Sequence, residues 1–160
     1  MSYLTAVRCL LSLFIAIIVS ITMTGCSMIG GDTDVTMTIH VDADINPDED
    51  SKPSPLFVRM YELKSDKLFN RANFIDLYEK DKDILGADLV RKEALKTMVP
   101  GEDHIKKFVA DKETRYIALY AEFFRYKNSN YKIIFPVTVN NVFRDKVKIL
   151  ISANNITLLK

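Results

Sequence analysis

Cysteine, histidine and tryptophan are scarce in this chain of 160 residues, which has two cysteines, two histidines and no tryptophan. A nucleophilic enzyme needs an activated serine, cysteine or threonine beside a base, and the histidine bases on offer are only His40 and His104. His40 falls on the polar side of an alternating stretch and His104 follows a Pro-Gly turn, so both are expected to be solvated. We therefore predict that the protein is not an enzyme and holds no metal or other cofactor.

An excess of charge of either sign is also lacking. The chain carries 22 basic and 21 acidic residues, a formal net charge of +1. Nucleic-acid-binding proteins need a basic stripe or face, so nucleic acid is not an expected partner. The five glycines form no phosphate-binding loop, and no small-molecule substrate is predicted.

A hydrophobic run long enough to cross a membrane is missing as well. The run from Cys9 to Met23 has 15 residues, whereas a spanning helix needs about 20. Arg8 precedes this run, and the next basic residue is Lys52. A basic start, a short apolar run and small residues after it are typical of a secretory signal peptide, which we predict over residues 1–25.

The cysteine that ends this segment makes the interpretation more specific. Met23-Thr24-Gly25-Cys26 resembles the bacterial lipobox, in which the thiol takes up a diacylglyceryl group and cleavage makes the cysteine the new N-terminus. We predict that Cys26 carries an N-acyl and an S-diacylglycerol lipid, and several acyl chains hold a protein on a membrane stably. Ser27 follows, and the resemblance to enterobacterial lipoproteins implies the inner leaflet of the outer membrane, facing the periplasm. The alternatives are an ordinary cleaved signal peptide and an uncleaved anchor.

The rest of the chain is predicted to hold a flexible tether, residues 26–34 with the lipidated cysteine, and one domain, residues 35–160. Every second residue from Val35 to Val41 is apolar, which predicts a half-buried strand. Extended structure is also predicted at 56–63, 88–99, 114–126, 131–135, 146–151 and 156–159.

A helical insertion interrupts these strands. A short helix is predicted over Asn70–Leu77, and Phe74, Leu77 and Tyr78 are expected to pack against a sheet. Asp83–Leu85 is expected to form another helical turn, which Gly86 stops. Short strands with turn signals and one helical insertion favour an antiparallel β-sandwich.

The stretch from Ala43 to Pro55 is rich in acids and prolines, which predicts an exposed loop. Its start resembles a calcium loop, but Pro47 stands where a glycine is needed and Pro53 where a bidentate glutamate is needed. Metal is therefore not expected there. The segment is either a solvated acidic loop or a recognition loop, because function concentrates on loops held by a rigid scaffold.

Several short motifs follow the lipobox and the first strand in a fixed order: Asn46-Pro47-Asp48, Pro55 to Lys64, Ala72 to Tyr78, Leu85 to Leu89 and Pro100-Gly101. In this order they resemble the TssJ (SciN-like) family of outer-membrane lipoproteins of type VI secretion. The resemblance covers nearly all of the chain after the signal peptide. It implies a transthyretin-like antiparallel two-sheet β-sandwich with a small helical insertion.

The resemblance also implies a partner, the periplasmic C-terminal region of the inner-membrane protein TssM, and a task, anchoring the type VI secretion membrane complex. The contact loop of the family maps onto residues 43–55. The predicted partner-binding residues are Asp44, Ile45, Asn46, Pro47, Asp48, Glu49, Asp50 and Ser51. Asn46 and Pro47 are expected to make shape-specific contacts, and Asp48 and Glu49 electrostatic ones. The alternative is a periplasmic binding module of another class, an enzyme inhibitor or a transthyretin-like ligand carrier.

Overall fold

The computed structural model describes residues 33–138 and 145–159. Contacts within the chain divide it into two units, Met1–Gly30 and Gly31–Lys160, and all described residues belong to the second. The predicted signal peptide, Cys26 and most of the tether lie outside the described residues. Among the helices of the described ranges, none is both long and apolar enough to cross a membrane.

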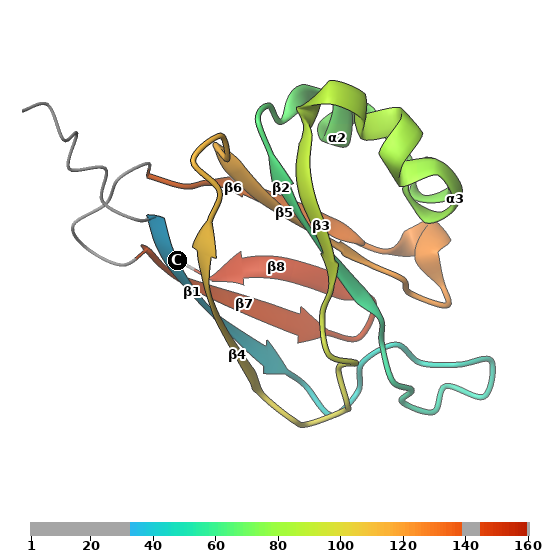
Figure 1. Cartoon of the computed structure of the whole chain (residues 1–160). Coiled ribbons are helices and arrows are strands. Elements are labelled where there is room, and N and C mark those ends of the chain that lie inside the picture. Colours follow the sequence, from blue (N-terminus) through green and yellow to red (C-terminus); the bar gives the residue numbers. More distant parts are fainter. Residues whose placement is uncertain (1–32, 139–144, 160) are drawn as a thin grey trace, which may run out of the picture. The chain divides into compact units, whose positions relative to one another are not determined.

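Two four-stranded sheets face each other and enclose the main core (Figure 1). The first sheet has the order β4 (His104–Ala110), β1 (Thr33–Val41), β7 (Asp145–Ser152) and β8 (Asn155–Leu159). The second has the order β3 (Leu89–Ala94), β2 (Val58–Leu63), β5 (Tyr116–Ala121) and β6 (Lys132–Pro136). The predicted β-sandwich is confirmed.

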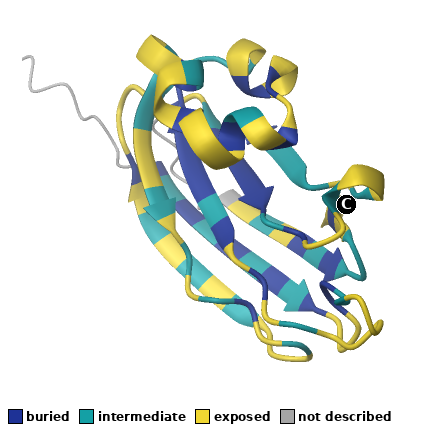
Figure 2. Ribbon diagram, turned by 90° about the vertical axis from the view of Figure 1, so that its right-hand side faces the viewer, coloured by how far each residue is buried: buried dark blue, intermediate teal, exposed yellow. Residues whose placement is uncertain are grey.

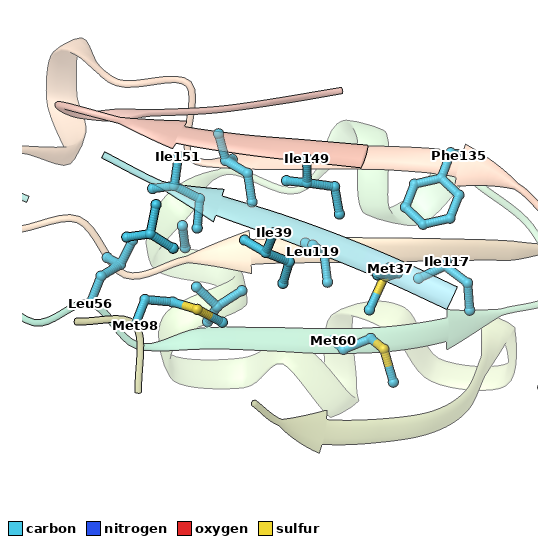
Figure 3. Packing of buried hydrophobic residues seen from close by; sticks show 14 of the residues in the cluster. Met37, Ile39, Leu56, Met60, Met98, Ile117, Leu119, Phe135, Ile149 and Ile151 are labelled. Atoms are coloured by element: carbon cyan, nitrogen blue, oxygen red, sulfur yellow. The ribbon is translucent and has the colours of Figure 1, made fainter. Parts of the chain in front are cut away.

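The alternation of β1 produces the inner face of the first sheet. Val35, Met37, Ile39 and Val41 are at most 4% exposed, as predicted, while the residues between them are half-buried. Figure 3 shows Met37 and Ile39 directed between the sheets, toward Ile117 and Leu119 of β5 and Met60 of β2. Two apolar faces that exclude water from each other in this way supply the main driving force for the fold.

The pairing of β1 with β7 corrects the prediction of a wholly antiparallel sandwich. These strands are parallel, with Met37 opposite Val147 and Ile39 opposite Ile149. Parallel neighbours need a long crossover, and here the chain completes the second sheet between β1 and β7. The other strand pairs are antiparallel.

The helical insertion consists of two helices, α2 (Lys67–Arg71) and α3 (Phe74–Leu85), followed by the 3₁₀ turn η1 (Gly86–Asp88). The helix predicted over 70–77 is wrong in its bounds, whereas the helical turn expected at Asp83–Leu85 is the last part of α3, which ends at Gly86. α2 ends before Ala72, and Asn73 starts α3, because its side chain caps that helix in a reciprocal capping box with Asp76. Figure 2 shows the buried residues gathered on the strands, while exposed residues lie on the helices, on the loops and on parts of some strands.

α2 and α3 cover the outer face of the second sheet (Figure 1). Phe74 and Leu77 pack there with Tyr61 and Tyr120 in a second apolar cluster. Tyr78 was also predicted to pack, but it is 51% exposed. Its ring instead receives the guanidinium of Arg59, 5.5 Å from the ring centroid.

Arg59 and Asp81 join α3 to this sheet through a largely buried network. Arg59 Nη1 donates to Asp81 Oδ2 at 3.2 Å and to the carbonyl of Leu77 at 3.0 Å. Tyr61 Oη donates to the same carboxylate oxygen at 2.8 Å, and Lys92 Nζ lies 2.5 Å from it. Because each donor comes from a strand and Asp81 from the helix, the network fixes the helix on the sheet.

Candidate partner-binding surface

The loop predicted to bind a partner connects β1 to β2 at the end of the sandwich opposite to the start of β1 (Figure 1). β1 is nine residues long and runs from Thr33, where the tether would join, to Val41, where the loop begins. At about 3.3 Å per residue, that separation is roughly 26 Å. The loop and Thr33 therefore lie at opposite ends of one strand.

Backbone hydrogen bonds fix the base of the loop to the β7–β8 turn. Asp42 N donates to Ile151 O at 2.9 Å and Asn46 N donates to Ala153 O at 2.8 Å. Ala153 N donates in return to Asp44 Oδ1 at 3.1 Å. These bonds join segments about a hundred residues apart in the chain. Together they hold the base of the loop in one position against the β7–β8 turn.

Asn46 is the residue that organises this base. It is 6% exposed and has a φ of 48°, a left-handed conformation that asparagine tolerates better than most residues. Its Nδ2 donates to Pro55 O at 2.9 Å, and its Oδ1 accepts from Phe124 N at 2.8 Å. One amide thus closes the loop and joins it to the chain beyond β5.

The exposed tip of the loop runs from Pro47 to Pro53 and has its own hydrogen bonds. Asp48 N donates to Lys52 O at 2.9 Å, and Asp48 Oδ1 accepts from Lys52 N at 2.9 Å. Asp50 and Lys52 form an ion pair at 3.6 Å in which both side chains are 75% exposed, so it contributes little to stability. The tip is a short ordered turn that presents carboxylates to solvent.

The eight predicted contact residues divide into two groups. Ile45 and Asn46 are buried at 0% and 6% exposure, so they shape the loop and offer little surface to a partner. The shape-specific contact expected of Asn46 stays a prediction, and the amide that would make it is used inside the protein. The residues of this set with surface available are Asp44, Pro47, Asp48, Glu49, Asp50 and Ser51.

A second acidic segment lies beside the loop base. Gly101 N donates to Asp42 O at 3.2 Å, which brings the turn before β4 next to the loop. Asp103 in that turn accepts from Val41 N at 3.1 Å and from His40 Nδ1 at 2.8 Å. The hydrogen bond from the Val41 amide, and then that from His40, lower the pKa of Asp103 below its usual range. The Asp103 carboxylate therefore stays ionised and adds negative charge to the end of the sandwich where the loop lies.

The segment after β5 belongs to the same surface, which the predicted elements did not indicate. Extended structure was predicted from Thr114 to Tyr126, but β5 ends at Ala121 and the chain turns into the 3₁₀ turn η2 (Tyr126–Asn128). Phe124 is 58% exposed, and Arg125 Nη2 donates to Glu49 O at 3.0 Å. The pair Phe123-Phe124 was a sequence signal for an exposed aromatic side chain. Adjacent residues of an extended segment point to opposite faces, so the two phenylalanines cannot both face the core.

Metal binding finds no support in the described part of the chain. It contains no group of three or more His, Cys, Asp or Glu side chains placed to hold a metal ion. In the loop that resembles a calcium site, Asp44 and Asp48 each accept a backbone N–H.

Comparison with protein families gives a match over residues 33–155 to the family described as type VI secretion lipoprotein, VasD, EvfM, TssJ. The chain belongs to this family. It is therefore a lipoprotein component of a type VI secretion system, as the resemblance implied. Comparison with curated proteins gives no match.

Solved structures of TssJ-type lipoproteins have the same fold. The T6SS lipoprotein TssJ1 from Pseudomonas aeruginosa is 26% identical, with a TM-score of 0.74 over 80% of this chain and 95% of that one. Serratia marcescens Lip, a membrane-bound component of the system, is 20% identical, with a TM-score of 0.72 over 81% and 97%. A chain from the structure entitled T6SS protein TssM C-terminal domain, from EAEC, is 19% identical, with a TM-score of 0.66 over 79% and 98%. These matches confirm the β-sandwich with a small helical addition.

Proposed function

We propose that this TssJ-family protein is lipidated on Cys26, lies on the inner leaflet of the outer membrane, and binds the periplasmic C-terminal region of TssM. In this role it anchors the type VI secretion membrane complex by binding, without catalysis. The family match over residues 33–155 is the observation that carries the proposal.

The place of the loop supports this role. A tether that joins β1 at Thr33 holds that end of the strand near the membrane, and the β1–β2 loop then lies about 26 Å further away. A partner that rises from the inner membrane approaches from this side. The loop therefore presents its acidic tip in the direction from which TssM would come.

The ligand-carrier alternative gains no comparable support. A carrier needs a pocket of roughly 300–1,000 Å³. A partly enclosed hollow lined by Ile39, Met98 and His104, among others, holds about 140 Å³, and larger hollows of about 430 and 440 Å³ are shallow and open to solvent. The first is too small for a carrier and the others are not deep, while the acidic loop suits a protein partner.

The anchor is tested by labelling cells with a palmitate analogue. We expect wild-type protein to incorporate the label and to fractionate with the outer membrane, and Cys26→Ser to do neither. Equal labelling of both proteins, or a Cys26→Ser protein that stays in the outer membrane fraction, would place the anchor elsewhere.

The partner is tested by calorimetry between the full-length protein in detergent and the purified periplasmic C-terminal region of TssM from the same system. Wild-type binding is expected to weaken as salt rises, because charges that lie in solvent are screened. The double variant Glu49→Lys, Asp50→Lys is expected to bind less tightly and to depend less on salt.

The control for net charge is Glu79→Lys, Asp83→Lys, which makes the same charge change on the exposed side of α3. It is expected to bind like wild type. Equal weakening in both double variants would mean that net charge alone, rather than the loop tip, governs binding.

A further inference from the structure

Phe124 is a large apolar side chain that the packing of the domain leaves in solvent, with 58% of its surface exposed. Its neighbour Phe123 is 2% exposed and belongs to the main core. The segment that carries Phe124 lies against the tip of the β1–β2 loop, because Asn46 Oδ1 accepts from Phe124 N and Glu49 O accepts from Arg125 Nη2.

The surface around Phe124 is hollowed on both sides. Asp48, Glu49, Asp50 and Phe124 line one hollow of about 290 Å³. The segment from Phe124 to Asn128 lines another of about 280 Å³. Tyr126 and Lys127 also line a third hollow of about 430 Å³, beside Asn73 and Ile75 at the start of α3. The first two hollows share Phe124 and the last two share Tyr126 and Lys127, so they are neighbours on the surface, and we call this row of hollows the groove.

We propose that Phe124 is the apolar centre of the docking surface, and that the groove holds a partner segment with an apolar side chain over Phe124 and a lysine or arginine against the loop tip. This inference rests on the proposed function, since it completes the surface to which the loop belongs. The occupant is a segment of the periplasmic protein partner.

The charges along the groove give the partner segment a direction. Asp48, Glu49 and Asp50 give the tip side an excess of negative charge, although the guanidinium of Arg125 reaches Glu49 O there, whereas Lys127 lines the hollow on the other side of Phe124. A basic side chain of the partner is attracted to the first side and repelled by the second. The segment therefore binds with its basic residue toward the tip.

The hydrogen bonds between the two segments prepare this surface before binding. Asn46 fixes the backbone of Phe124, and Arg125 fixes the backbone of Glu49, so the loop and the aromatic side chain keep their relative positions. Ordering that is already complete in the free protein lowers the entropy cost of association. Aromatic and charged side chains are also common among the few interface residues that contribute most of the binding energy.

The test compares Phe124→Ala with the tip variant Glu49→Lys, Asp50→Lys in the full-length protein, using the TssM periplasmic C-terminal region as probe. Phe124→Ala is expected to weaken binding by about tenfold or more, the size expected of a central aromatic anchor. Its salt dependence should match wild type, because no charge changes. Phe124→Leu should restore part of the affinity.

The matched control is Ile105→Ala, which removes an apolar side chain of 67% exposure from the outer face of β4. It is expected to bind like wild type. Wild-type affinity in Phe124→Ala, together with weak binding in the tip variant, would overturn this inference and leave the proposed function in place. A loss of binding matched by an equal loss of folded protein in thermal unfolding would also overturn it. Absence of binding by the unchanged protein would overturn both proposals.

Discussion

Asn46 shows that a residue chosen from sequence for recognition can be used inside the protein. Its backbone adopts a φ of 48°, and its amide bonds to Pro55 O and Phe124 N. Both bonds are shielded, since the residue is 6% exposed. A buried donor or acceptor left unpaired costs about 1–3 kcal/mol.

Asn46→Ala is therefore expected to lower the free energy of unfolding by about 1–3 kcal/mol, measured by denaturant titration. Asn46→Gly separates the causes, because glycine adopts positive φ freely and still lacks the amide. A loss in both variants assigns the effect to the amide. Wild-type stability in Asn46→Gly would show that the hydrogen bonds contribute nothing.

Asp81 gives the fold a dependence on pH. Burial acts to raise its pKa, but Lys92, Tyr61 and Arg59 together outweigh burial and hold the pKa below its usual range. An acid with a lowered pKa in the folded state adds stability above its unfolded pKa, about 3.9, and that stability is lost as pH falls through the folded pKa.

We expect Asp81→Asn to be less stable than wild type at pH 7, and the difference in free energy of unfolding to shrink as the pH falls below about 4. Denaturant titrations at several pH values measure this difference. Parallel pH profiles for the two proteins would show that the Asp81 charge contributes no stability.

At the scale of elements, the β1–β2 loop consists of a buried base and an exposed tip with separate roles. Replacing residues 47–53 with a Gly/Ser segment of equal length keeps Asn46 and should change the free energy of unfolding by no more than about 0.5 kcal/mol. Replacing 46–52 instead removes Asn46, and should cost about 1–3 kcal/mol. Thermal unfolding compares the two seven-residue replacements, and equal losses would contradict the division.

The C-terminal end of α2 depends on one lysine from the neighbouring sheet. Lys132 Nζ donates to Phe69 O, Asn70 O and Ala72 O at 2.9, 2.9 and 2.6 Å. These carbonyls lack partners within a helix end, and a cation there also matches the helix dipole. Burial lowers the pKa of Lys132.

Lys132→Met keeps the apolar stem and removes the ammonium, so it is expected to destabilise the protein by about 1–3 kcal/mol. Amide hydrogen exchange should accelerate in α2 more than in β1, which is far from the change. Uniform acceleration across both elements, with no preference for α2, would contradict the capping role.

At the scale of the whole molecule, the domain from Asp32 onward is expected to fold alone as a β-rich monomer without disulfide or metal. Its two sheets bury a continuous apolar cluster, and its residues include no cysteine. Circular dichroism should show a cooperative transition, and EDTA should leave the melting temperature unchanged. A large shift with EDTA would reveal a metal bound to the folded state.

The sequence alone determined the local patterns. Alternating apolar residues identified β1 and its inner face, because this period follows from how side chains leave the backbone, and the extended structure predicted at 114–126 contains β5. β4 could not be predicted in this way. Its exposed outer face carries the apolar residues Ile105 and Val109. An argument from alternating apolar residues would therefore take the exposed face of this strand for the buried one.

Only the tertiary structure decided the parallel pairing of β1 with β7, the burial of Asn46 and the place of Phe124 beside the acidic tip. Each depends on a hydrogen bond or packing contact between residues far apart in the chain. Local sequence sets which face of a strand is apolar. The free energy gained when distant segments pack and satisfy each other's polar groups decides which segments become neighbours.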